Sequence, residues 1–186
     1  PNNNGKVGMF GISYPGFYTS MGMIDTHPAL KAASPQAPIA DWFMGDDLHH
    51  NGAFFLSQNL GFFYSFEQKS DDPLRDGGRK FVFNNPDGYD LFLRMGSLGN
   101  SDTVLFKSAI PTWTEFLAHP NYDAFWQARN IRPHLKNIRC AVMTVGGWFD
   151  AEDLFGALNV YKSVETQSAP TASNMLVMGP WPHGGW

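Results

Sequence analysis

The sequence predicts an α/β fold in which helices cover a mostly parallel sheet. Near both ends of the chain, short apolar runs end in glycine or proline turns and are followed by amphipathic segments. Alternation of strand, turn and helix is typical of parallel sheets, because parallel strands need a long crossover connection. Hydrophobic residues make up 43% of the 186 residues and charged residues 16%, a balance that allows a substantial core and excludes intrinsic disorder.

Four short runs are the predicted strands of this sheet. Each is mostly apolar and is closed by glycine, by Pro180 or by Ser34-Pro35; the runs are Lys6–Phe10, Leu30–Ala33, Arg139–Val145 and Met175–Met178. Two helices are predicted between them, over Gly16–Ile24 and over 151–166. In the second helix Leu154, Leu158 and Tyr161 recur at helical spacing.

The middle of the chain differs in texture and predicts a mostly helical insertion. It holds most of the phenylalanines and two turn-forming clusters, Asp71-Asp72-Pro73 and Asn84-Asn85-Pro86-Asp87-Gly88. Helix-like pieces occur at Gly88–Met95 and Tyr122–Arg129. The predicted division is therefore a first part of the core over 1–47, a helical cap over 48–137, and a second part of the core over 138–186.

Charge and cysteine content narrow the classes of function. Thirteen lysines and arginines stand against seventeen acidic residues, with no basic cluster, so a nucleic-acid partner is not expected. No apolar run approaches the ~18 residues of a membrane span. Cys140 is the single cysteine, and its apolar surroundings predict a core residue rather than a disulfide or metal ligand. We expect no metal and no organic cofactor.

The turn Gly11-Ile12-Ser13-Tyr14-Pro15-Gly16 joins a predicted strand directly to a predicted helix. A serine in this context can occupy a strained position at the edge of a sheet and act as a nucleophile. The usual Gly-x-Ser-x-Gly pattern is broken, because Pro15 stands where the second glycine is expected and Gly16 follows one residue later. The backbone N–H of Tyr14, at the helix N-terminus, would face a developing oxyanion. An ordinary glycine-rich turn with Ser13 as a helix cap is the alternative.

Asp150 and His183 complete a chain order of Ser, Asp, His, the order typical of α/β-hydrolases. Each follows a predicted strand, where a parallel sheet presents its catalytic loops. Taken alone, Asp150 could equally be an N-cap of the following helix. His183 taken alone would be a surface residue. Together they predict that Ser13 is the nucleophile, His183 the general base and Asp150 the acid that orients the imidazole. The other histidines do not follow such a run: His27, His49, His50, His119 and His134.

Four motifs in this sequence resemble those of the α-amino-acid ester hydrolases. They are Gly-x-Ser-Tyr-x-Gly at 11–16, Trp-x-Met-Gly-Asp-Asp at 42–47, Trp-x-Asp-x-Glu-Asp at 148–153, and Met-Gly-Pro-Trp-x-His at 178–183. That family is part of a group of serine hydrolases with X-Pro dipeptidyl peptidases, cocaine esterase and glutaryl-cephalosporin acylases. The resemblance runs along nearly the whole chain.

The resemblance implies an α/β-hydrolase fold with a helical cap and gives each candidate residue a role. It implies a triad of Ser13, Asp150 and His183 with Tyr14 as backbone oxyanion donor. It also implies that Asp47, Glu152 and Asp153 form the carboxylate cluster that binds the α-ammonium group of the substrate. Several acceptors in a partly dry pocket hold a cationic amine well. From the residues alone, Glu152 and Asp153 would be first-turn acids favoured by the helix dipole.

The sequence departs from the family in ways that bear on its partners. Pro15 replaces a residue that is often acidic, Phe149 replaces a tryptophan, and Leu48-His49-His50 replaces an aromatic-rich stretch. The upstream strands, a tyrosine hydroxyl of the oxyanion hole and a C-terminal jelly-roll domain are not in this chain. We therefore expect the remainder of a larger parent chain to cover an exposed edge and an apolar sheet face. The resemblance also implies a periplasmic or secreted location and a possible homo-oligomer.

The leading hypothesis is a serine hydrolase or acyltransferase that acts on esters or amides of α-amino acids, as β-lactam antibiotic acylases do. Its substrate would be a small molecule or short peptide with a free α-amino group. Within the same group, an X-Pro dipeptidyl peptidase or a glutaryl-cephalosporin acylase is the alternative. From another class, a catalytically inactive α/β-hydrolase-like binding domain stays open.

Overall fold

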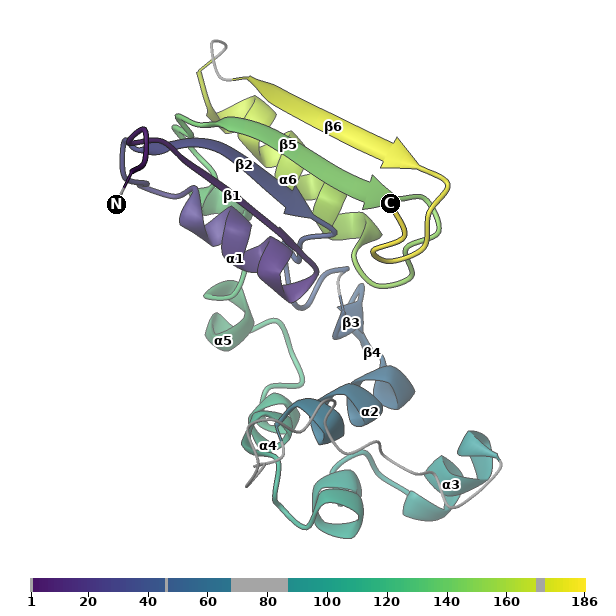
Figure 1. The fold of residues 1–186 in the computed structure, drawn as a ribbon. Helices are drawn as coiled ribbons and strands as arrows, with labels where there is room; N and C mark the ends of the chain where they lie inside the picture. The colour runs from purple at the N-terminus through teal and green to yellow at the C-terminus, as the bar shows by residue number, and fades with distance from the viewer. Residues whose placement is uncertain (1, 46, 68–86, 170–172) are drawn as a thin grey trace. The chain divides into compact units, whose positions relative to one another are not determined.

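The structure is a computed structural model that describes residues 2–45, 47–67, 87–169 and 173–186. The chain divides into two compact units. One comprises residues 1–53 and 124–186, and the other comprises residues 54–123. All the candidate site residues belong to the first unit, which holds the main sheet (Figure 1).

The main sheet has four parallel strands in the order β1-β2-β5-β6. The strands are β1 (Val7–Ile12), β2 (Leu30–Gln36), β5 (Ala141–Gly147) and β6 (Asn174–Gly179). Helix α1 (Tyr14–Gly22) connects β1 to β2, and α6 (Leu154–Gln167) connects β5 to β6. The four predicted strands and the parallel α/β architecture are confirmed. Parallel order matters for the site, because the carboxyl ends of all four strands meet at one edge.

Strand β2 is longer than expected: the predicted end at Ser34-Pro35 is wrong, and the strand continues to Gln36. Proline has no N–H to donate to a neighbouring strand. The register with β5 accordingly includes Ala32, Ala33 and Gln36 and omits the two residues between. The Ser34 hydroxyl donates to the carbonyl of Met143 on β5 at 2.9 Å. This side chain therefore joins β2 to β5 where their backbone pairing is interrupted.

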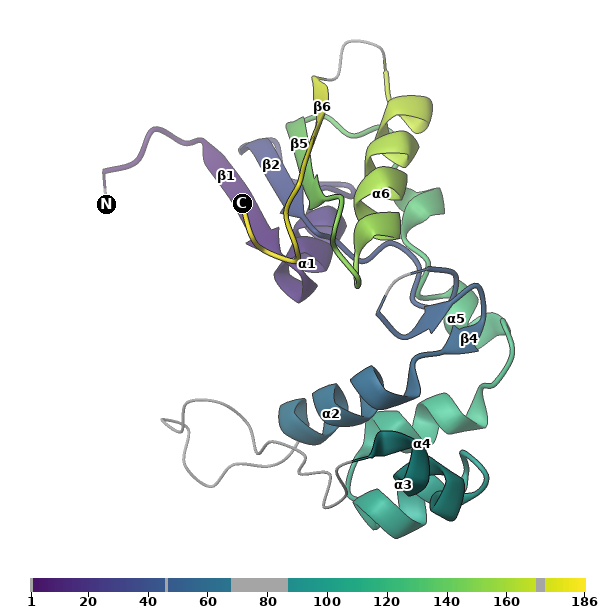
Figure 2. The same cartoon turned by 90° about the vertical axis from the view of Figure 1, so that its right-hand side faces the viewer.

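The core of this unit lies between the sheet and its two helices. Both helices cover the same face of the sheet (Figure 2). One buried cluster joins Ala33 and Val142 of the strands to Val160 and Val164 of α6 and to Met23, which directly follows α1. Met9 and Phe17 are partly buried and pack against this cluster, and Cys140 is buried in it, as predicted.

Among the described residues, no helix covers the opposite face of the sheet (Figure 2). Several apolar side chains on that face are exposed. Phe10 is 76% exposed and Met175 50% exposed. Ile12, Met143 and Val177 also leave more than a third of their surface open. Large contiguous apolar patches are uncommon on the solvent-exposed surface of proteins, and they usually mark a surface that contacts another part of the protein or a partner.

The second unit is helical and is held together by aromatic side chains. Its elements are α2 (Leu56–Phe66), α3 (Gly88–Met95), the π-helix η1 (Asp102–Phe106) and α4 (Pro111–Ala118). Trp113 is fully buried, meets the rings of Phe54 and Phe106 edge-on, and donates its Nε1–H to the Ser101 hydroxyl at 2.8 Å. These aromatic residues therefore form a core. The helix predicted over Gly88–Met95 is confirmed, whereas 71–73 and 84–86 lie outside the described residues.

The remaining elements are short. Strands β3 (His49–His50) and β4 (Ala53–Phe54) pair with each other, and α5 (Ala124–Gln127) and the 3-10 helix η2 (Arg132–His134) precede β5. The helix expected over Tyr122–Arg129 is thus only one turn long. Across the described ranges, no helix has both the length and the apolar character needed to cross a bilayer.

Candidate active site

Ser13 sits in a strained turn between β1 and α1. Its φ of 66° lies in the left-handed region that non-glycine residues rarely adopt. The backbone N–H of Ser13 donates to the carbonyl of Gln36 at 2.9 Å, which fixes the turn at the end of β2. Gly11 is required here, since a Cβ at this position would lie 2.4 Å from the Pro15 oxygen. Ser13 is the N-cap residue of α1, as the alternative held, but its side chain makes no capping hydrogen bond to the helix.

The glycine of this turn is needed at position 16, one residue later than in the usual pattern. A Cβ on Gly16 would lie 2.3 Å from the Gln36 carbonyl oxygen, so only glycine lets α1 approach β2 this closely. Pro15 occupies the first turn of α1, where its missing N–H costs no hydrogen bond. The nucleophile-type turn is therefore compatible with Pro15 at this position.

The loops after β5 and β6 are bonded to each other. Trp148 donates its backbone N–H to the Gly179 carbonyl at 2.8 Å, and Phe149 donates to the Trp181 carbonyl at 3.1 Å. Gly147 permits this approach, because a Cβ there would lie 2.1 Å from the Trp181 oxygen. The two loops therefore hold a fixed relation to each other.

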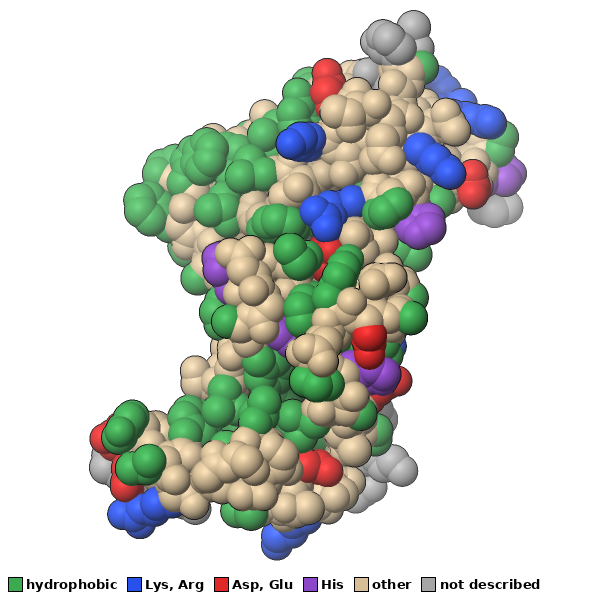
Figure 3. Space-filling model, turned by 180° about the vertical axis from the view of Figure 1, so that it is seen from behind, with side chains coloured by type: hydrophobic (Ala, Val, Ile, Leu, Met, Phe, Trp, Pro, Cys, Tyr) green, Lys and Arg blue, Asp and Glu red, His purple; other side chains and the backbone are tan. Residues whose placement is uncertain are grey.

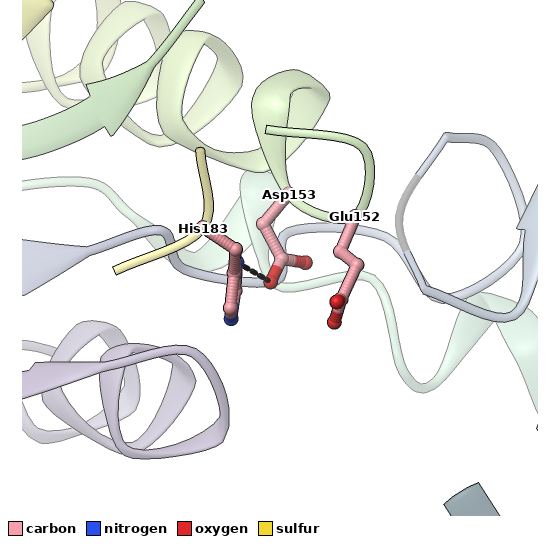
Figure 4. Close-up of side chains that lie close together, drawn as sticks. All are labelled: Glu152, Asp153 and His183. Atoms are coloured by element: carbon pink, nitrogen blue, oxygen red, sulfur yellow. Dashed lines mark ion pairs between the residues drawn. The ribbon is translucent and has the colours of Figure 1, made fainter. Parts of the chain in front are cut away.

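Asp150 and His183 meet as a consequence of that loop pairing. Nδ1 of His183 lies 2.9 Å from Oδ2 of Asp150. The Asp150 side chain is fully buried, whereas that of His183 is 26% exposed. When Nδ1–H is donated to the carboxylate, the neutral ring leaves Nε2 as the acceptor. Figure 4 shows that nitrogen at the end of the ring that points away from the acidic side chains.

Asp150 also organises the turn that precedes α6. Its Oδ1 accepts the backbone N–H groups of Glu152 and Asp153 at 2.9 and 3.0 Å. The helix begins at Leu154, and not at 151 as expected, because residues 150–153 form this turn first. Asp150 therefore binds the turn with one oxygen and His183 with the other, whereas the N-cap residue of α6 is Asp153.

The ionisation of the pair follows from these contacts. Burial opposes the charge on Asp150, but the hydrogen bonds from His183 and from the backbone of Asp153 and Glu152 outweigh it and lower the pKa of Asp150. The hydrogen bond to Asp150 raises the pKa of His183 against the effect of burial, and the charges of Asp150, Glu152 and Asp47 raise it further. An ion pair is thus favoured when the ring takes up a proton.

The segment that carries His183 reaches the ends of β1 and β2. A Cβ on Gly184 would lie 3.7 Å from the Ile12 side chain, and Ile12 directly precedes Ser13. The indole N–H of Trp186 donates to Oε1 of Gln36 at 2.7 Å. The hydroxyl-bearing turn and the imidazole loop therefore share one edge of the sheet.

Asp47, Glu152 and Asp153 also lie together beside His183. The backbone N–H of Asp47 donates to the Glu152 carbonyl at 3.4 Å, and Oδ2 of Asp153 lies 3.7 Å from Nδ1 of His183. Figure 4 shows the side chains of Glu152 and Asp153 next to the imidazole. Burial raises the pKa of Asp47 to about 6, and the charge of Glu152 adds to this effect. Crowded carboxylates of this kind favour a cation between them.

Glu152, Asp153 and His183 are also the described side chains that can together hold a metal ion. One ligand atom from each lies within 4.8 Å of the others. Nδ1 of His183, however, is already bonded to Asp150. Glu152 and Asp153 can accept hydrogen bonds from an organic ammonium group without any contribution from the imidazole.

Sequence reasoning missed two residues behind this cluster, Asp41 and Arg132. The Asp41 carboxylate is fully buried and accepts a hydrogen bond from Nη2 of Arg132 at 2.6 Å. Asp41 starts a turn that leads to Asp47, which is a local signal. Arg132 is remote in sequence and gave no signal.

Trp148 and Phe149, in the loop after β5, are exposed. Figure 3 shows hydrophobic side chains gathered where β5 and β6 end.

A family model described as X-Pro dipeptidyl-peptidase (S15 family) matches residues 1–185. The chain belongs to the S15 family. A curated relative of this S15 chain is a cocaine esterase from Rhodococcus sp. (strain MB1 Bresler), 23% identical over 97% of the chain and 31% of the relative. The predicted membership in this group of serine hydrolases is thereby confirmed.

Solved structures of S15-like proteins match the chain throughout. An α-amino acid ester hydrolase labelled with selenomethionine is 36% identical, with a TM-score of 0.86 over 97% of the chain and 29% of that structure. An aminopeptidase from the marine sediment archaeon Thaumarchaeota archaeon is 35% identical, with a TM-score of 0.85 over 99% of the chain and 30% of that structure. The chain spans about a third of the length of these relatives.

Proposed function

We propose that this chain carries the catalytic residues of a serine hydrolase that acts on esters or amides of α-amino acids. The observation that carries the proposal is the 2.9 Å hydrogen bond between Asp150 and His183, at the sheet edge where Ser13 occupies a strained turn. Membership in the S15 family and likeness to an α-amino acid ester hydrolase support it.

The proposed reaction proceeds through an acyl-enzyme. Ser13 Oγ attacks the acyl carbon while Nε2 of His183 takes its proton, and Asp150 stabilises the imidazolium that forms. The backbone N–H of Tyr14, at the start of α1, stabilises the oxyanion. His183 then returns the proton to the leaving alcohol or amine. Water completes hydrolysis by the same steps, and an amine in its place gives acyl transfer.

The acidic cluster sets the proposed substrate class. Burial, and then repulsion from Glu152, raise the pKa of Asp47, and an ammonium group held by Asp47, Glu152 and Asp153 would offset both effects. A glutaryl side chain would bring another carboxylate to the same place, so the cluster disfavours a glutaryl-cephalosporin substrate. An X-Pro dipeptide also presents a free amine, and the family match favours it as the second candidate.

Labelling of the parent protein with a fluorophosphonate tests the nucleophile. We expect one adduct on Ser13 and no adduct in Ser13→Ala. A parent protein that is not labelled at Ser13 would contradict the enzymatic proposal and favour a binding domain.

Paired esters test the substrate class. We expect a much higher kcat/KM for phenylglycine methyl ester than for methyl phenylacetate, which lacks only the amino group. Equal rates would remove the ammonium site from the proposal. Faster cleavage of an X-Pro anilide would assign the enzyme to the dipeptidyl peptidases instead.

A further inference from the structure

The described residues on both sides of position 46, Asp41–Gly45 and Asp47, are held by hydrogen bonds. Oδ1 of Asp41 accepts the backbone N–H groups of Phe43 and Met44 at 3.0 and 3.2 Å. The N–H of Asp47 donates to the carbonyl of Glu152 at 3.4 Å. The backbone of Asp47 is therefore held beside Glu152, and the residues from Asp41 to Gly45 are held separately by the Asp41 side chain.

Arg132 connects Asp41 to α6. Its Nη2 donates to Oδ2 of Asp41 at 2.6 Å, and its Nε donates to Oδ1 of Asn130 at 3.0 Å. Its guanidinium carbon lies 5.4 Å from the centre of the Phe155 ring, within the range of a cation–π contact. Phe155 belongs to the first turn of α6, two residues after Asp153.

Phe155 in turn packs against the segment from Asp41 to Gly45. A Cβ on Gly45 would lie 2.6 Å from the Phe155 ring, so glycine allows the segment to rest on this side chain. The guanidinium of Arg132 thus contacts the residue that shapes the segment and the residue on which the segment packs. The charges of Glu152, His183 and Asp150 act directly on Asp47, whereas the side-chain contacts of Arg132 are with Asp41, Asn130 and Phe155.

We propose that Arg132, acting through Asp41, is a positioning residue that fixes the Asp47 carboxylate within the ammonium-binding cluster. This inference rests on the proposed function of that cluster. A small displacement of a substrate-positioning group is expensive, since about 1 Å can cost about a hundredfold in rate. Loss of the Arg132 link therefore weakens binding of the amino group more than it slows the chemical steps at Ser13.

Steady-state kinetics of the parent protein test the proposal with Arg132→Gln, Asp41→Asn and the double variant. Asn at 41 keeps an oxygen for the N–H groups of Phe43 and Met44, and the double variant leaves no buried unpaired charge. We expect each variant to raise KM for phenylglycine methyl ester by about 10- to 100-fold, with a small change in kcat and an unchanged KM for methyl phenylacetate. The double variant should lose no more than either single variant, because both act through one link.

Arg139→Gln is the matched control, because Arg139 is exposed and precedes β5 at the opposite end of the sheet. It should change neither KM. Equal losses on the two esters, or additive losses in the double variant, would overturn the positioning role while the proposed function stands. A wild-type enzyme that does not distinguish the two esters would remove the ammonium site from the proposed function, and the positioning role with it.

Discussion

Asp150 shows how one side chain can serve the fold and the site together. Its Oδ1 closes the turn before α6, and its Oδ2 holds the imidazole of His183. Removing the charge keeps the shape of the side chain but changes which proton the imidazole carries. Structure and reactivity can therefore be separated experimentally at this residue.

Asp150→Asn should lower kcat by about 10⁴-fold, because the amide favours the wrong tautomer of His183. The raised pKa of His183 also predicts that kcat/KM falls as the pH drops through a value above the ordinary range of histidine. In the variant this acidic limb should move to lower pH, since the main cause of the shift is removed. A pH–rate profile measured at saturating and limiting substrate checks both effects, and an unmoved limb would contradict the assignment.

Asp47 should give the enzyme a second pH dependence, in binding. With a pKa of about 6, the carboxylate is ionised at pH 8 and protonated at pH 5. KM for phenylglycine methyl ester should therefore rise as the pH falls through about 6, whereas KM for methyl phenylacetate should not. Asp47→Asn should remove this rise and increase KM by about tenfold at pH 8, the effect of losing one charge-assisted hydrogen bond.

The same residue predicts an effect on stability with a defined sign. A folded-state pKa above the ordinary value of 3.8 means that the folded protein binds more protons than the unfolded chain between pH 4 and 6. Stability is therefore lost as the pH rises through that window. The difference in free energy of unfolding between Asp47→Asn and wild type should therefore favour the variant more at pH 8 than at pH 4. Urea unfolding at the two pH values measures this difference. A difference that favours the variant more at pH 4 would contradict the shift.

At the scale of elements, the site depends on glycines that let backbones approach each other. Gly147→Ala places a methyl group 2.1 Å from the Trp181 oxygen, so the loop that leads to His183 must move. We expect a loss of about 1–3 kcal/mol in stability together with a lower kcat. Gly61→Ala in α2 is the control, since a Cβ there meets nothing within 4 Å, and it should stabilise by up to about 1 kcal/mol. Thermal unfolding and ester hydrolysis measured on both variants decide the matter.

Local pattern was enough to predict most elements of the sheet. The apolar runs and the turn residues that follow them located all four strands, because a buried parallel strand needs little beyond an apolar run and a turn. The errors lie where a long-range contact overrides a local signal. Pro35 signals a strand end, yet β1 pairs with β2 through Pro35 and Gln36, and the Ser34 hydroxyl supplies the missing link to β5. Residues 150–153 suit a helix, yet Asp150 draws them into a turn.

The candidate site was predictable to the extent that its residues follow strands. Ser13, Asp150 and His183 each stand just after an apolar run, and parallel topology brings such positions to one edge. The resemblance supplied the acidic cluster, which spacing alone did not reveal. Arg132 was beyond reach, because a single cation in a loop carries no signal of the carboxylate it meets 91 residues away.

At the scale of the whole molecule, we expect the exposed apolar face of the sheet to be buried by another part of the protein. We propose that the remainder of the parent chain buries it, as the relatives of about three times the length suggest. Phe10, 76% exposed in this chain, lies on that face. If the parent covers it, Phe10→Ser should destabilise the parent protein by about 1.5–3 kcal/mol.

An exposed aromatic residue of the helical unit provides the comparison. Tyr89 is 73% exposed on α3, and Tyr89→Ser should change stability by no more than about 0.5 kcal/mol. Denaturant unfolding of the parent protein measures both variants. Equal, small effects would show that the sheet face stays open to solvent.

The order of the strands along the chain has a consequence for biosynthesis. The turn with Ser13 leaves the ribosome before β6, and the loop with His183 follows that strand. In the proposed mechanism, Ser13 has no base to activate it until β6 docks beside β5. The proposed hydrolytic activity would therefore arise only after these two strands have paired.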